Sequence, residues 1–165
     1  MNDVIRFFVP GVSTGQPRHQ TVRTRGKNGA MHQFPAKRNH PIHNYRAAVR
    51  YGFMQAGGQM LSGPLSVRIV WVMPRPANRC WKRRPMPREF KDTKPDLDNL
   101  EKGVFDELEK LAFENDSRIA SVVKAKVIAS GDVPDPIGTY IQIGTVKDHE
   151  IGLIDQFIRR FEGAK

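Results

Sequence analysis

The chain has 165 residues, 39% of them hydrophobic, and a formal net charge of +10. This length suits one domain with a buried core, and the composition excludes a disordered basic tail. No stretch of 18 apolar residues occurs, so we expect no contact with a membrane. The single cysteine, Cys80, excludes an internal disulfide and a cysteine-rich zinc site. Without a recognisable secretory signal at the N-terminus, we expect a cytoplasmic protein.

Charge is distributed unevenly along the chain. Residues 1–95 hold 18 Lys and Arg but only three acids, whereas residues 96–116 hold eight of the 17 acids. A strongly basic surface favours a polyanionic partner, because phosphates attract Lys and Arg and release counterions on binding. Acids that merely balanced this charge would be scattered. Their concentration in one segment of a basic chain therefore marks that segment as a candidate site.

The first half of the chain predicts two strands and one helix. A β-branched and aromatic run at residues 4–9 predicts a strand that Pro10 and Gly11 end. Residues 11–41 are basic and largely irregular, a length that compact domains seldom contain without a function. Apolar residues at helical spacing predict a helix over residues 42–57, and residues 65–73 predict a second strand.

The second half begins with a basic, proline-rich loop at residues 74–94. The clearest helix follows at about residues 98–113, where leucines and a valine form one apolar stripe. Residues 119–128 and 140–143 predict strands, and residues 151–161 predict an amphipathic helix.

Neither an internal repeat nor a second domain is evident. We therefore expect a single α+β domain over residues 1–165, with a small mixed sheet of about four strands and two to three helices.

Three aspartates flank the clearest helix. Asp96 and Asp98 stand at its start, since Pro95 disfavours an earlier beginning, and Asp116 follows its end. Aspartate commonly caps a helix, so the Asp-x-Asp pattern is by itself a weak sign of metal binding. A helix of about 16 residues is roughly 24 Å long, so Asp116 can join the others only if the chain returns after the helix and the next strand runs beside the preceding one.

If the three carboxylates meet, they suit Mg²⁺, which is typically held by a few carboxylates, water and substrate phosphate. Such an ion activates water and stabilises a leaving oxygen in phosphodiester hydrolysis. Lys102 lies one helical turn after Asp98. It forms either an ion pair with Asp98 or a contact with the reacting phosphate, and spacing alone does not separate these interpretations.

The clearest helix and its flanks contain a distinctive set of residues: Lys94-Pro95-Asp96-Leu97-Asp98-Asn99-Leu100, Lys102, Phe105-Asp106, Asp116-Ser117, Ile119 and Lys126. This set resembles the RusA family of Holliday-junction resolvases. The resemblance implies an α+β homodimer, encoded by phages and prophages, that acts in DNA recombination and repair. It implies resolution of four-way DNA junctions by paired symmetric nicks, with Mg²⁺ as cofactor and Mn²⁺ as a substitute. It also implies Asp96, Asp98 and Asp116 as catalytic metal ligands, and Lys102 as a lysine important for cleavage.

The chain departs from the family pattern in several places. Asn115 stands where the family often has a second acid, the 11–41 and 74–94 segments are long, and residues 148–165 extend past the usual end. The basic side chains that we expect on DNA are Arg75, Arg79, Lys82, Arg83, Arg84, Lys94, Lys124 and Lys126.

Three alternative functions remain open at this stage. One is a less selective branched-DNA or flap endonuclease. Another is a non-catalytic basic nucleic-acid-binding module, whose acids only cap and solubilise a helix. The third is an RNA-directed protein that stacks bases on Trp81 and Phe90.

The C-terminal helix has two interpretations. It either packs on its own sheet or contributes to a homodimer interface through Ile151, Ile154, Phe157, Ile158 and Phe161.

Overall fold

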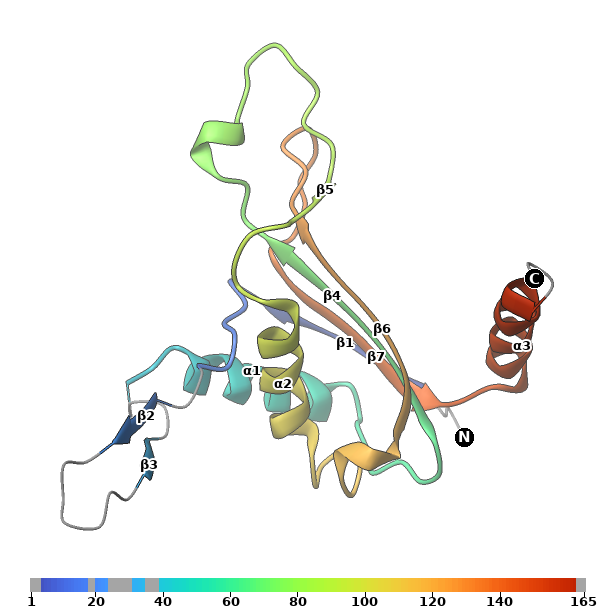
Figure 1. Ribbon diagram of the computed structural model, residues 1–165. Coiled ribbons are helices and arrows are strands. Elements are labelled where there is room, and N and C mark those ends of the chain that lie inside the picture. Colours follow the sequence, from blue (N-terminus) through green and yellow to red (C-terminus); the bar gives the residue numbers. More distant parts are fainter. Residues whose placement is uncertain (1–3, 18–19, 24–30, 35–38, 163–165) are drawn as a thin grey trace.

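A five-stranded mixed sheet forms the body of the protein in the computed structural model, which describes residues 4–17, 20–23, 31–34 and 39–162 (Figure 1). The strand order is β1-β7-β4-β6-β5. Strands β4 and β6 pair in parallel, and the other neighbours pair antiparallel. The strand bounds are β1 Val4–Pro10, β4 Leu65–Met73, β5 Glu89–Phe90, β6 Ile119–Ile128 and β7 Gly138–Thr145.

Three helices accompany the sheet: α1 Ile42–Gln55, α2 Leu97–Leu108 and α3 Asp148–Glu162. The α+β class is confirmed, with five strands in the main sheet instead of about four. The basic segment 11–41 is less irregular than expected in its described part, because β2 Gln20–Arg23 and β3 Met31–Phe34 form an antiparallel pair.

The helix expected at residues 98–113 ends earlier, at Leu108. Lys110 takes a left-handed backbone conformation, with φ of 66°, which breaks the helical repeat. Its backbone N–H donates to the carbonyl of Phe113 at 2.7 Å. A tight turn therefore replaces the last helical turn before a short 3-10 helix at Asp116–Arg118.

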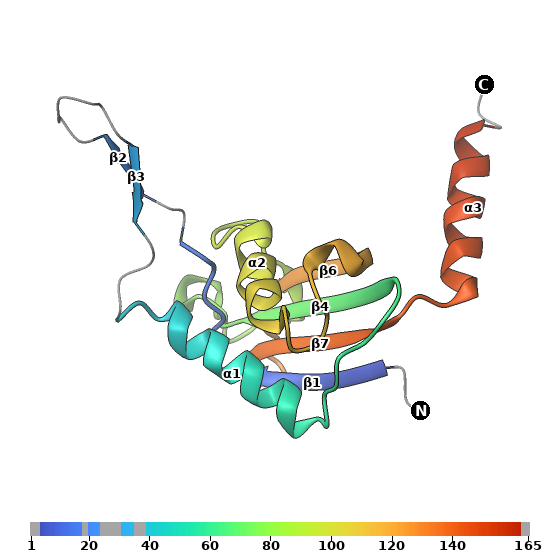
Figure 2. The ribbon, with the colours of Figure 1, turned by 90° about the horizontal axis from the view of Figure 1, so that it is seen from below.

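The core lies between one face of the sheet and helices α1 and α2, which both lie on that face (Figure 2). Alternate residues of β4 point into it, and α2 supplies Leu100, Val104 and Leu108, all fully buried. Burial of each such leucine stabilises the fold by roughly 1.5–3 kcal/mol. The apolar stripe read from the sequence is thus the face that holds α2 on the sheet.

The C-terminal helix α3 stands away from the sheet in both views (Figures 1 and 2). Glu150 in its first turn accepts a hydrogen bond from Ser66 at 3.0 Å and pairs with Arg68 at 3.3 Å. Farther along, the exposed side chains Ile151, Leu153, Ile154 and Ile158 retain 46–60% of their accessible surface. The interpretation that α3 packs on its own sheet is therefore wrong for these side chains. The side chains of Phe157 and Phe161 lie outside the described part.

Within the described ranges, none of the helices has the length and apolar character that crossing a lipid bilayer requires.

Candidate functional site

The start of α2 carries the first two candidate carboxylates. Asp96 is the N-cap residue, with extended backbone angles, and Asp98 lies exposed in the first turn. The Asp96 carboxylate does not make a capping hydrogen bond to the helix backbone. It instead accepts a long hydrogen bond from the side-chain amide of Asn99, at 3.4 Å. Simple helix capping therefore does not account for Asp96 in this structure.

A cavity of about 550 Å³ opens beside Asp96. It is lined by Gly15, Gln16, Pro17, Lys94, Pro95, Asp96 and Asn99. The backbone N–H of Gln16 donates to the carbonyl of Asn99 at 2.8 Å, which holds the segment after β1 against α2. The Oε1 atom of Gln16 is buried and has no hydrogen-bond partner in the described structure.

Gln16 was missed by sequence reasoning, because it lies in a segment expected to be irregular and no local motif marks it. Neighbouring Gly15 is equally inconspicuous in sequence. A Cβ at Gly15 would lie 3.3 Å from the Cβ of Asn99 and 3.4 Å from that of Pro95, so glycine permits this close approach.

Asp116 lies at the opposite end of α2. The 12-residue helix spans about 18 Å. Strand β6 starts at Ile119, just after Asp116. Lys126, which contacts Pro95, lies seven residues farther along this strand, or about 23 Å from its start. Among the residues that the structure describes, no three His, Cys, Asp or Glu side chains gather closely enough to hold one metal ion.

The expectation that Asp96, Asp98 and Asp116 meet within one chain therefore needs correction. The strand after α2 does run beside the strand before it, as that expectation required. Because β4 and β6 are parallel, however, the helix between them runs in the opposite direction. Its start lies beyond the end of β4, and its end lies near the start of β6 (Figure 1).

Lys102 lies on the second turn of α2, with an exposed side chain. No ion pair joins it to Asp98 in the described structure, so the interpretation of Lys102 as half of a helical ion pair is not realised. Its ammonium is accessible to a substrate on the same face of the helix as Asp98.

Two lysines on β6 that were expected to bind DNA instead contact the protein. The ammonium of Lys126 donates to the carbonyl oxygens of Thr93 at 2.6 Å and Pro95 at 2.7 Å. Lys124 pairs with Glu101 on α2. Both lysines lie on the face of β6 that α2 covers, and both tie β6 to the α2 region.

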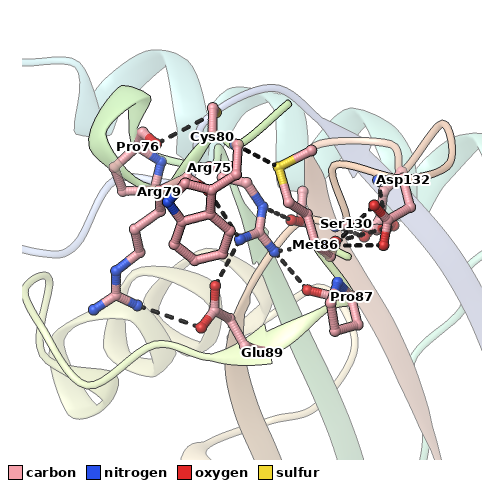
Figure 3. Close-up of polar contacts among 12 residues, drawn as sticks. Arg75, Pro76, Arg79, Cys80, Met86, Pro87, Glu89, Ser130 and Asp132 are labelled. Carbon is pink, nitrogen blue, oxygen red and sulfur yellow. Dashed lines mark hydrogen bonds and ion pairs between the residues drawn. The ribbon is translucent and has the colours of Figure 1, made fainter. Parts of the chain in front are cut away.

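Arg75 anchors the basic loop from within and is not placed to contact DNA (Figure 3). Its side chain is 6% exposed. Its guanidinium donates to Glu89 at 2.7 Å, to the carbonyl of Ala129 at 3.0 Å and to that of Met86 at 3.3 Å. Arg79 pairs with the same glutamate at 3.6 Å, with a partly exposed side chain. The prediction that Arg75 binds DNA is therefore corrected to a structural role.

A second ion pair ties the base of the loop to the turn before β7. Arg88 donates to Asp135 at 2.6 Å, and the Asp135 side chain is only 3% exposed. Hydrogen bonds from Arg88 and from the backbone N–H of Ser130 hold the pKa of Asp135 below its usual value, against the opposing effect of burial.

The exposed cations of the basic region lie on the outer part of the loop and next to α2. Lys82, Arg83 and Arg84 are exposed, as is Lys94 at the rim of the cavity. Trp81 and Phe90 in the same loop are 41% and 80% exposed. Lys82, Arg83 and Arg84 thus share the outer part of the loop with Trp81, whereas Lys94 lies next to the start of α2.

Comparisons with known proteins place this fold in a described family. A family model described as endodeoxyribonuclease RusA matches residues 10–143. The uncharacterized protein YqaN of Bacillus subtilis (strain 168) is 28% identical over 131 residues, which cover 75% of this chain and 87% of that protein. The range matched by the family model includes all three aspartates and ends before α3.

Proposed function

The chain belongs to the RusA endodeoxyribonuclease family, and from that premise we propose that it resolves four-way DNA junctions by Mg²⁺-dependent hydrolysis, as a homodimer. The observation that carries the proposal is the position of Asp96 and Asp98. Both stand at the start of α2, where Asp96 lines a cavity, in a protein of net charge +10. Acids placed next to a phosphate path weaken simple DNA binding, so their presence favours a catalytic role over a non-catalytic binding module.

The residues at this end of α2 fit a hard divalent cation. Mg²⁺ prefers oxygen ligands and is often held by only one or two carboxylates, with water and substrate phosphates completing its shell. Asp96 and Asp98 would supply those carboxylates. Bound Mg²⁺ would supply activation of water and neutralisation of charge on the phosphoryl group, and Mn²⁺ would substitute.

Other residues of the chain would bind and orient the DNA. Lys102, exposed one turn after Asp98, would contact the reacting phosphate. Lys94 would hold the phosphate backbone near the cavity, and the exposed cations Lys82, Arg83 and Arg84 would hold it farther along the loop.

The edge of β6 supports the homodimer and a role for Asp116 within it. Among the described strands, β5 pairs only with the last two residues of β6, so residues 119–125 form an open edge. Val122 and Val123 on this edge are 37% and 59% exposed. An open apolar edge is suited to pairing with another strand.

Antiparallel pairing of two β6 edges about Val122 would place Ile119 of one copy opposite Ala125 of the other. Asp116 of the second copy would then approach the Lys126 end of β6, where Asp96 lies. A two-fold dimer would contain two such three-carboxylate sites, which matches two symmetric nicks in a junction. The exposed isoleucines of α3 offer a further surface for the same dimer.

A cleavage assay tests the activity. The substrates are a four-way junction, a flap and a duplex, each with Mg²⁺, Mn²⁺ or EDTA. We expect paired nicks in the junction that EDTA abolishes. Asp96→Asn, Asp98→Asn and Asp116→Asn should each abolish cleavage but retain binding, whereas Glu114→Gln, a nearby exposed acid, should leave cleavage unchanged. Equal cleavage of flaps would favour the less selective nuclease, and no metal-dependent cleavage of any substrate would refute the nuclease assignment.

Mixing two inactive variants tests the shared site. If Asp116 acts on the other copy, a mixed dimer of Asp96→Asn and Asp116→Asn chains contains one intact site and one doubly altered site. The mixture should then nick one strand of a junction, although each variant alone is inactive. If all three aspartates acted within one chain, the mixture would remain inactive.

A further inference from the structure

Lys126 joins β6 to the segment that leads into α2. Its ammonium donates to the carbonyls of Thr93 and Pro95, on either side of Lys94 and directly before Asp96. Its own backbone carbonyl accepts from the N–H of Lys91 at 3.0 Å. The residue thus contacts the same connecting segment through its side chain and its backbone.

Within this segment the ammonium of Lys91 donates to the hydroxyl of Thr93 at 2.6 Å, but Lys126 supplies the hydrogen bonds that tie the segment to β6. The segment lies between the two-residue strand β5 and the start of α2, and Pro95 has no N–H to donate. Two carbonyl oxygens that converge on one ammonium restrict the backbone to conformations in which both face β6. The conformation of this backbone determines the position and direction of the Asp96 Cα–Cβ bond, and so of its carboxylate.

We infer that Lys126 is a positioning residue for the Asp96 carboxylate, and that its role is not to bind DNA. This inference rests on the proposed function, because it takes Asp96 as a metal ligand. Residues that orient ligating carboxylates typically affect metal affinity or activity by about 10- to 100-fold.

The test compares Lys126→Met, which keeps much of the side-chain length but removes the charge and the donors, with Lys126→Arg, which keeps both. Lys147→Met, in the exposed connection after β7, is the control for loss of one positive charge. For each variant we would measure Mn²⁺ binding by electron paramagnetic resonance, junction cleavage as kcat and KM, and the salt dependence of junction binding in EDTA. Amide hydrogen exchange over residues 91–100 supplies a readout that does not depend on activity.

In Lys126→Met, amide hydrogens of residues 91–100 should exchange faster than in the wild type. This variant should bind Mn²⁺ about 10- to 100-fold more weakly, and its kcat should fall by a similar factor. The slope of log junction affinity against log salt concentration (the salt slope) should equal that of the wild type. Lys126→Arg should recover most of each property, and Lys147→Met should match the wild type throughout.

Two results would overturn the inference. One is wild-type exchange and Mn²⁺ binding in Lys126→Met. The other is a salt slope reduced by about one unit with kcat intact, which is the signature of a phosphate contact. If the wild-type protein itself neither bound Mn²⁺ nor cleaved DNA, the proposed function would fail instead. Faster exchange in Lys126→Met would then still show that Lys126 orders the segment.

Discussion

The base and the tip of the 74–94 loop have the same basic composition but different surroundings. At the base, Arg75 and Arg88 are bonded to carboxylates and carbonyls of the protein. At the tip, Lys82, Arg83 and Arg84 are exposed. The base lies against the ends of β4 and β6 and the turn before β7, which supply these partners. A count of positive charges therefore does not separate cations that shape a loop from cations that face a ligand; that separation depends on which acids and carbonyls lie nearby in space.

Replacing Arg75 removes the anchor at the base of the loop. In Arg75→Met, Glu89 and several carbonyls lose a buried donor, and we expect the free energy of unfolding to fall by about 3 kcal/mol. Junction binding should also weaken, because the tip loses its support. Urea unfolding and a binding titration would measure both effects. Unchanged stability together with weaker binding would instead make Arg75 a direct DNA contact.

Removing the tip cations should weaken DNA binding but leave the stability of the fold nearly unchanged. With Lys82, Arg83 and Arg84 all replaced by alanine, the slope of log affinity against log salt should fall by about three units. The free energy of unfolding should change by less than about 0.5 kcal/mol, as for other exposed positions. Binding measured at several salt concentrations decides this. An unchanged slope would exclude the tip from the DNA interface.

The second anchor, Asp135, should make the stability of the protein depend on pH. Its folded-state pKa is lowered, so its contribution to stability is present above the usual carboxyl pKa near 4 and is lost as the pH falls through the folded value. Asp135→Asn should lower stability by about 1–2 kcal/mol at pH 7. The difference from the wild type should shrink as the pH is lowered below about 4. A difference that did not vary with pH would mean that the Asp135 charge contributes nothing.

Much of the fold could be predicted from local patterns. The apolar alternation of β4 and the stripe of α2 correspond to the faces that form the core, since burial imposes both periods. The end of α2 could not be predicted so well. Leu111 continues the apolar spacing, but Lys110 in a left-handed conformation ends the helix first. The hydrophobic pattern alone contains no signal for that turn.

The candidate carboxylates can be picked out in the sequence, but their arrangement in space cannot. Asp96 and Asp98 are neighbours in sequence and remain neighbours in space. Asp116 depends on the direction of β6, and parallel pairing with β4 sends it to the far end of the helix. The roles of Lys126 and Arg75 depend on carbonyl groups distant in sequence, which no motif reveals.

The pairing of β1 with β7 has a consequence for how the chain acquires its structure. Val4 lies opposite Gly144, and Pro10 lies opposite Gly138, so the first strand made is completed by the last strand of the sheet. During synthesis, β1 cannot pair with β7 until residues 138–144 have been made. Contacts between such distant segments slow folding, because a long loop must close before they form. Fragments that end before residue 138 would therefore leave β1 without a partner, and the sheet should form late, after synthesis of β7.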